Sequence, residues 1–279
     1  MSSRFFSLGV ILLLFVALVC LSCRGETAPR DRISIIPLTP IPPGQQGPTA
    51  VSSPVRGPRH VSLDYLVREV TVPPLPTAFA FPIPNDNLQR FLREAVKGQP
   101  GLSVVIENLR DGRSAFINAD QVHFAGALFH LSVLYEAFRQ KEAGQLDFAR
   151  VLKMEEKYAR YSQGSLELLE MRAGDTYRVR DALNAMIVVS DTPSALLLKE
   201  LTGSRQDETL KMLGLTSTSF NDDNQPTTAR DITRLLKAIA RAEGVASDSR
   251  QQMLALLMQE AVRDGIPALL PLDTRVAHK

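Results

Sequence analysis

His130 is the side chain of this sequence best suited to move a proton near neutral pH, because imidazole titrates in that range. It stands three residues after Ala127, in a stretch whose apolar spacing predicts a buried helix. The methyl group of Ala127 offers no hydroxyl to deprotonate. Ser132 would point about 140° away from Ala127 around such a helix, and Lys141 would lie about 20 Å farther along it, so neither replaces the hydroxyl. The residues alone favour a small core residue beside a partly buried imidazole.

Ser190, Asp191 and Thr192 form a second group, with two hydroxyls and a carboxylate in consecutive positions. Such groups can transfer protons or hold a substrate. The same residues are also typical of a helix start, in which Thr192 caps the first turn and Pro193 takes the first helical position. Both interpretations stay open at this point.

Composition excludes two classes of function. The four histidines are scattered without the spacing of metal ligands, so we expect no metal and no other cofactor. The formal net charge is only +2, with acids and bases interleaved, and no basic block indicates a nucleic-acid partner. A hydrophobic fraction of 44% can support a packed core.

The N-terminus has the layout of an export signal. Arg4 precedes an apolar run over residues 5–21, and Ser22 and Cys23 follow it. This resembles a bacterial lipoprotein cleavage box, which predicts a signal over residues 1–23 and lipidation of Cys23, although Cys20 is unusual for that box. An uncleaved membrane anchor and a plain secretion signal are the alternatives. All three predict a domain outside the cytoplasm, and the first two attach it to the membrane of the cell envelope.

Residues 24–86 differ in composition from the rest of the chain. Of its 18 prolines, 13 fall between Pro29 and Pro84. Proline fixes φ and removes amide donors, so this interval is predicted to be an extended tether. Residues 61–72 alternate apolar and polar side chains, and the sequence does not decide between a strand and a helical turn there.

Residues 87–279 are predicted to form one α+β domain. A helix from about residue 87 precedes a hairpin over 102–109 and 114–118, with an Asp-Gly turn between the strands. Helices are expected from about 127 to 143, before 189, after 192, after 228 and over 249–262, with a final strand from 275. Thr228 and Asp231 are predicted to be a capping pair.

Five segments in order resemble one family, the class A β-lactamase-like serine hydrolases, which share the fold of penicillin-binding proteins. The first leads into the buried helix, the second ends it, the third carries Ser190-Asp191-Thr192, the fourth starts a later helix, and the fifth ends at Lys279. They are residues 117–124, 142–146, 186–192, 227–231 and 276–279.

The resemblance implies a role for each candidate residue. The family's Ser-x-x-Lys motif falls on Ala127 and His130, so the nucleophile is lost and the general base is altered. Ser190 and Asp191 match the family's Ser-Asp-Asn, whereas Thr192 replaces the Asn that holds the substrate amide. Lys279 matches the Lys of Lys-Thr-Gly. In an active member the reaction would be acyl transfer through a covalent acyl-enzyme, with a backbone amide at the nucleophile position in the oxyanion hole.

The loop over residues 219–226 contains no Glu, which class A enzymes need for deacylation; Asp222 and Asp223 are its carboxylates. We therefore expect a non-catalytic, exported homologue that binds β-lactams or peptidoglycan peptides. The alternatives are an active β-lactamase with another nucleophile and a non-functional remnant. Because the chain stops within the Lys-Thr-Gly motif, the family pattern also predicts that its C-terminal strands are missing.

Overall fold

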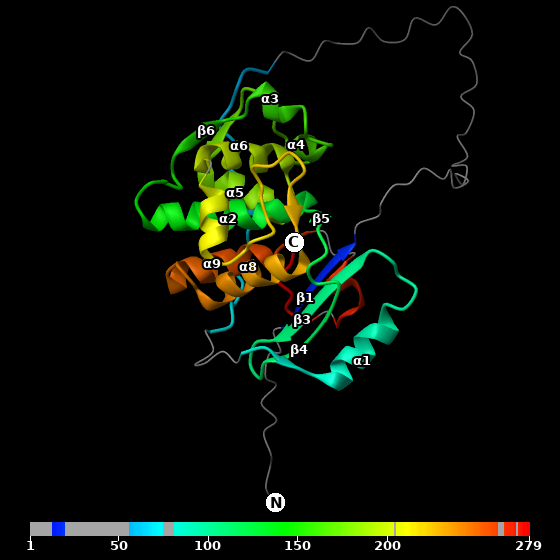
Figure 1. Cartoon of the computed structure of the whole chain (residues 1–279). Coiled ribbons are helices and arrows are strands. Elements are labelled where there is room, and N and C mark those ends of the chain that lie inside the picture. The colour runs from blue at the N-terminus through cyan, green and yellow to red at the C-terminus, as the bar shows by residue number, and fades with distance from the viewer. Residues whose placement is uncertain (1–12, 20–55, 75–80, 204, 262–264, 272) are drawn as a thin grey trace, which may run out of the picture.

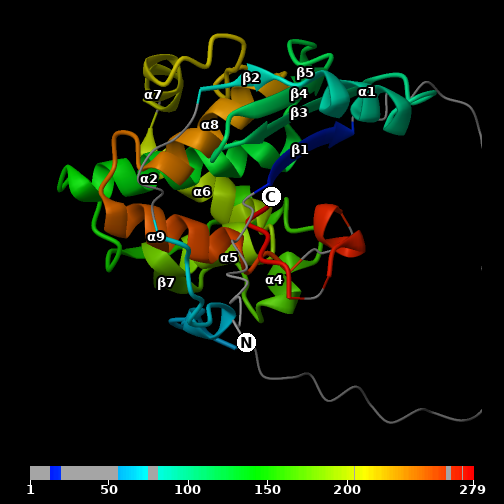
Figure 2. The same cartoon turned by 90° about the horizontal axis from the view of Figure 1, so that it is seen from below.

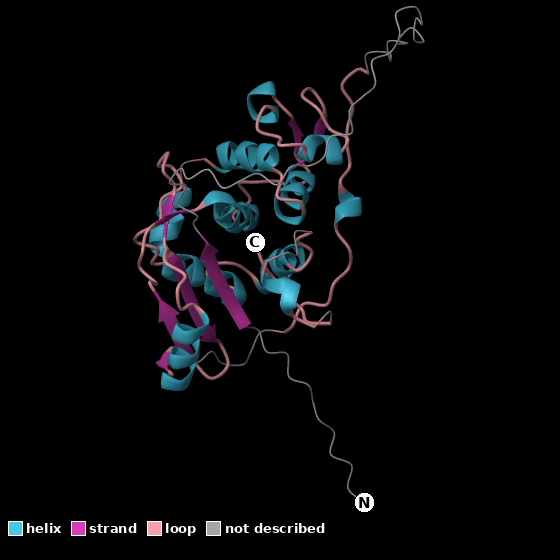
Figure 3. Ribbon diagram, turned by 90° about the vertical axis from the view of Figure 1, so that its right-hand side faces the viewer, coloured by secondary structure: helices cyan, strands magenta, loops and turns pink. Residues whose placement is uncertain are grey.

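The computed structural model describes residues 13–19, 56–74, 81–203, 205–261, 265–271 and 273–279. In these residues a mostly antiparallel sheet stands beside a cluster of helices, as Figure 3 shows in magenta and cyan. This arrangement confirms the predicted α+β fold class.

The predicted hairpin forms the centre of the sheet. Strands β3 (Leu102–Asn108) and β4 (Arg113–Ile117) pair antiparallel, and Gly112 takes the positive φ of 76° that the turn between them requires. The short β2 (Ile83–Pro84) pairs parallel with β4, and β1 (Leu13–Val19) pairs antiparallel with β3. The strand order is therefore β1-β3-β4-β2; Figure 1 labels the first three of these strands, and Figure 2 labels all four.

Helices cover both faces of this sheet. Val104 and Ile106 of β3 pack with Leu92 of helix α1 (Asp86–Ala95) on one face. Val105 points to the other face, where it packs against Ala229 of helix α8 (Ala229–Arg241). This alternation follows from the two-residue period of a strand, and it explains why β3 is apolar on both sides.

Helix α2 (Phe129–Glu142) is the central element of the helical part. Eleven of its fourteen residues are buried, and these include the polar side chains of His130, Ser132, Glu136 and Gln140. Around it lie the longer helices α5 (Val179–Val188), α6 (Thr192–Thr202), α7 (Gln206–Met212), α8 and α9 (Ser247–Leu257). Shorter elements complete the fold: β5 (His123–Phe124) with β8 (Pro226–Thr227), β6 (Val151–Lys153) with β7 (Thr176–Arg178), α3 (Glu156–Ala159), α4 (Ser165–Leu168) and the 3-10 turns η1 (Asp64–Leu66), η2 (Gly126–Leu128) and η3 (Ile266–Leu269).

Residues 56–74, which we call the strap, pack against the helical part. The turn η1 settles the conformation that the sequence left open at 61–72. Leu63 is fully buried, and its amide donates to the Asp181 carboxylate at 3.1 Å. Arg250 of α9 donates to the Pro73 carbonyl at 3.0 Å, and Figure 2 shows the strap beside α9. Part of the interval predicted as a tether is therefore part of the packed domain.

Two segments near the ends of the chain behave differently from expectation. Residues 13–19, which fall within the predicted export signal, form β1. The strand predicted from residue 275 is wrong: residues 275–279 form no ladder, and the Lys279 side chain instead reaches into the helical part. Cys23 lies outside the described residues. Within the described ranges, no helix is long and apolar enough to cross a membrane.

Candidate active-site cleft

A sharp turn presents Ala127 at the start of α2. Gly126 adopts a φ of 53°, and η2 then places the exposed methyl of Ala127 between the buried side chains of Ala125 and Phe129. The Ala125 amide donates to the Gln225 carbonyl at 3.0 Å, which extends the β5–β8 ladder up to this turn. The position of the predicted nucleophile is therefore rigidly held and open to solvent.

Ser190 occupies the short connection between α5 and α6. Its φ of 56° is rare outside glycine, so the backbone is strained at this residue. The Asp191 carboxylate accepts the Ser194 amide at 2.8 Å and the Ser165 hydroxyl, and it thereby caps α6. The predicted capping role of Thr192 is wrong, because Asp191 is one residue earlier and its carboxylate takes the amide.

Ala127, Ser190 and Thr192 meet in one open cleft of about 1230 Å³. They reach it from η2, from the α5–α6 connection and from the first turn of α6. Asp191 is fully buried behind them and acts on the helix, not on the cleft. The structure thus brings together three of the sequence-predicted positions, and the cleft is larger than most small-molecule sites.

His130 borders the same cleft but is 1% exposed. Neither ring nitrogen makes a hydrogen bond to any residue in the described part of the chain. Burial, reinforced by the nearby charge of Lys279, lowers the pKa of His130 to about 3, and the neighbouring Met186 carbonyl opposes this only weakly, without hydrogen-bond geometry. His130 is therefore neutral at physiological pH, and it is a weak base.

Lys279 approaches from behind the cleft. Its Nζ donates to Glu260 Oε2 at 2.6 Å and to the Ile187 carbonyl at 3.1 Å, and both charged side chains are almost completely buried. Burial lowers the pKa of Lys279, while Glu260 opposes the shift. Lys279, the residue predicted to match the family's lysine, does not line the cleft. Its charge acts on His130 from behind the cleft.

Several cleft residues were missed in the sequence. Tyr158 donates to the Glu200 carboxylate, and Lys157 Nζ lies 3.1 Å from both of its oxygens. These hydrogen bonds, that from Tyr158 first, lower the pKa of Glu200. Tyr161 and Arg160 continue the same wall. The alternation of aromatic and basic residues over 157–161 was the signal that could have revealed it.

The loop over residues 219–226 forms another part of the border. Asp223 lines the cleft together with Asn221 and Gln225. Asp222 does not line it, since its carboxylate accepts the Asn224 amide at 2.7 Å within the loop. Of the two candidate carboxylates, only Asp223 is thus placed at the site.

No metal centre is formed by the described residues, which contain no group of three or more His, Cys, Asp or Glu side chains in ligating positions. The buried His123 is bonded to Ser103 Oγ at 2.7 Å, and His130 stands apart from carboxylates. The polar groups that line the cleft are hydroxyl, ammonium, guanidinium, carboxylate and carboxamide groups.

Comparison with known proteins agrees with this architecture. Residues 86–279 match the profile described as the Beta-lactamase enzyme family. A solved structure of PBP-A has a TM-score of 0.66 and 23% identity over 72% of this chain and 79% of that one, and a mutant of it is an acyl-enzyme complex with penicillin G. A β-lactamase from Chitinophaga pinensis has a TM-score of 0.63 and 18% identity over 70% and 78%. No curated protein sequence matches the chain.

Proposed function

Because this chain belongs to the β-lactamase enzyme family, we propose that it is a non-catalytic member that binds β-lactams or peptidoglycan peptides without being acylated. The observation that carries the proposal is the exposed methyl of Ala127 at the place of the nucleophile, in a cleft that is otherwise open. Recognition needs the walls of such a cleft, whereas acyl transfer also needs an activated hydroxyl.

The remaining hydroxyls do not replace the lost one. Ser190 is the only serine lining the cleft in the described part of the chain, and no lysine or histidine is hydrogen-bonded to it there. Thr192 stands in the first turn of α6, two residues after Ser190. His130 is too weak a base to take the proton of either. These features favour binding over an active hydrolase.

The direct test combines covalent labelling with reversible binding. We expect a fluorescent penicillin to leave the purified chain unlabelled on a denaturing gel, next to an active penicillin-binding protein that is labelled. Penicillin G and a synthetic peptidoglycan stem peptide are then titrated separately and followed by the shift in melting temperature. A labelled serine would show an active enzyme; no labelling and no binding of either ligand would favour the non-functional remnant.

A matched pair of variants locates the binding. Tyr161 and Phe116 are both 46% exposed, but only Tyr161 lines the cleft. We expect Tyr161→Ala to weaken reversible binding by about tenfold, because contact with an aromatic ring contributes on the order of 1 kcal/mol. Phe116→Ala should leave the binding unchanged. Equal effects of the two substitutions would place the ligand elsewhere.

The proposed location is the bacterial cell envelope, with a lipid on Cys23. The apolar run before Ser22-Cys23 supports this, as does the proline-rich composition that follows it. In a bacterial host the chain is expected in the membrane fraction, and Cys23→Ala is expected to abolish incorporation of labelled fatty acid. Unchanged processing and attachment in that variant would favour an uncleaved anchor instead.

A further inference from the structure

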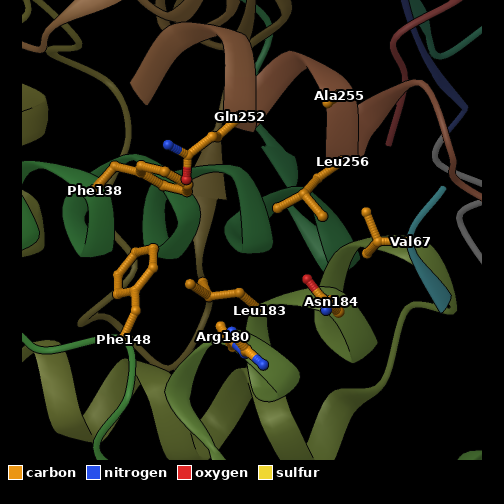
Figure 4. Close-up of a pocket in the computed structure, with 9 residues that line it drawn as sticks. All are labelled: Val67, Phe138, Phe148, Arg180, Leu183, Asn184, Gln252, Ala255 and Leu256. Carbon is orange, nitrogen blue, oxygen red and sulfur yellow. The ribbon is translucent and has the colours of Figure 1, made fainter. Parts of the chain in front are cut away.

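A second cavity, of about 190 Å³, lies between α2, α5 and α9 and shares no lining residue with the cleft. Most of its lining is apolar: Phe138 comes from α2, Leu183 from α5 and Leu256 from α9, and Phe148 closes one side. Arg180, Asn184 and Gln252 are its polar lining residues. Figure 4 shows these side chains converging on the space between the three helices. Neither the family resemblance nor the proposed function uses this cavity.

The size and lining of the cavity fit one aromatic ring. An apolar cavity of roughly 150 Å³ lined by Leu, Ile and Phe binds benzene, so this space accepts a ring with a short substituent. The rings of Phe138 and Phe148 stand at 84° to one another with centroids 5.0 Å apart. Such an arrangement offers an aromatic guest both a face and an edge to pack against.

A cation stands at the rim. Lys141 Nζ lies 4.9 Å from the Phe148 ring centroid and 5.5 Å from that of Phe138. It is bonded to Gln252 Oε1 at 3.4 Å, and no carboxylate of the described chain pairs with it. Arg180 also lines the cavity, but its guanidinium is already paired with Asp64 at 2.9 Å. Lys141 therefore has its charge available to an anionic ligand.

We propose that this cavity is a binding site for a small aromatic carboxylate. The ring occupies the space between Phe138, Phe148 and Leu183, and the carboxylate meets the ammonium of Lys141 at the rim. The Gln252 amide holds that ammonium at the rim: its Oε1 accepts from Lys141, and its Nε2 donates to Asp248 Oδ2 at 2.5 Å. An apolar pocket with a few polar groups at its edge is the usual form of a small-molecule site.

The test uses the full-length chain and sodium benzoate, followed by NMR of the ligand and of labelled phenylalanine rings. A ligand of this size is expected to bind with a Kd on the order of 1 mM. Ala255→Leu fills the cavity from α9 and should abolish binding. The control Ala95→Leu, at an exposed position of α1, should retain it. The proposal would be overturned if benzoate did not bind at ten times the expected Kd, or if Ala255→Leu bound it as well as the wild type does.

The charge is tested separately. Lys141→Met keeps the length of the side chain and removes its ammonium, so we expect a roughly tenfold weaker affinity for benzoate and an unchanged affinity for neutral benzyl alcohol. Circular dichroism establishes that each variant is folded. Equal weakening for both ligands would contradict the role of Lys141, because the loss would then reflect packing and not charge.

Discussion

At the scale of single residues, the cleft is defined by a methyl group and an unpartnered imidazole. A low pKa keeps His130 neutral, but the same low pKa makes it a poor acceptor for the proton of an alcohol. Under the proposed non-catalytic role, the methyl of Ala127 and the weakly basic His130 are two separate obstacles to acyl transfer at the same site. Removing only one of them should not produce the reaction.

Ala127→Ser tests this directly. The substitution returns a hydroxyl to an exposed position, where it meets no steric obstacle, but no competent base is bonded to it. We expect no fluorescent-penicillin adduct within the time in which an active penicillin-binding protein is fully labelled. Intact-protein mass spectrometry checks the result, and an adduct at residue 127 would show that another group activates the serine.

His130 should also make the protein sensitive to acid. Its folded pKa of about 3 lies below the ordinary value of 6.5, so between these pH values the unfolded chain binds a proton that the folded chain excludes. The stabilisation is complete above pH 6.5 and is lost as the pH falls, by about 2 kcal/mol between pH 7 and pH 5.

His130→Leu is expected to remove that part of the pH dependence. It should also be neutral or stabilising at pH 7, because it eliminates two buried nitrogens that lack partners. Urea unfolding at pH 7 and pH 5 measures both effects. His60→Leu, at an exposed histidine, is the control and should keep the wild-type difference between the two pH values.

At the scale of elements, one buried contact of the strap and one of the sheet can each be tested by substitution. Leu63 attaches the strap to the helical part by complete burial, in addition to its bond to Asp181. Leu63→Ala is expected to reduce the free energy of unfolding by about 2–4 kcal/mol. Tyr65→Ala, at a side chain that is 65% exposed, should change it by less than about 0.5 kcal/mol. Equal effects in urea unfolding would mean that the strap is not part of the cooperative unit.

The sheet is joined to α8 by a buried ion pair. Lys237 Nζ lies 2.6 Å from Glu107 Oε1, with side-chain exposures of 11% and 6%. Lys237→Met leaves the carboxylate buried without its cation and should cost about 3–5 kcal/mol. The double variant Glu107→Leu/Lys237→Met should be more stable than the single one, because no uncompensated charge remains. A double variant that is less stable than Lys237→Met would contradict this account.

The elements that the sequence predicts well are those whose signal is local. The hairpin has its Asp-Gly turn, and α1 and α8 have apolar faces. Thr228 caps α8, and its hydroxyl accepts the Asp231 amide at 3.1 Å. The strap could not be placed, because Leu63 is buried by residues more than 100 positions away. The conformation of residues 275–279 likewise depends on a distant partner, Glu260, and not on strand propensity.

The same division applies to the cleft. The resemblance of short motifs located Ala127, Ser190 and Thr192, since the backbone of the family places them together. It did not locate Tyr158, Tyr161 or the carboxylate of Glu200, which enter the cleft through tertiary packing of α3 and α6. Nor did it indicate that Asp191 would turn away to cap a helix.

At the scale of the whole molecule, the pairing of β1 with β3 joins the first described residues to the centre of the sheet. Val16 is directly opposite Val105 in this ladder. The Cα atoms of such residues are about 4.5–5.5 Å apart, and a disulfide can bridge that separation. In a chain with Cys20 and Cys23 replaced by Ser, we expect Val16→Cys with Val105→Cys to form an intramolecular disulfide under mild oxidation. The pair Val16→Cys with Leu102→Cys, three positions out of register, is the control, and cross-linking of both pairs alike would refute this register.

The β1 pairing also makes the order of events in the cell matter. The segment Leu13–Val19 is a strand in this structure, while the proposed export signal includes the same residues, and it cannot serve the translocation machinery and the sheet at once. Its ladder joins residues about 90 positions apart, such as Val16 and Val105, and contacts of that sequence separation form slowly. Under the proposed export, slow closure of the sheet would give the secretion machinery time to recognise the nascent chain. Cleavage of the proposed signal would then leave β3 with a bare edge that could recruit a strand from another molecule.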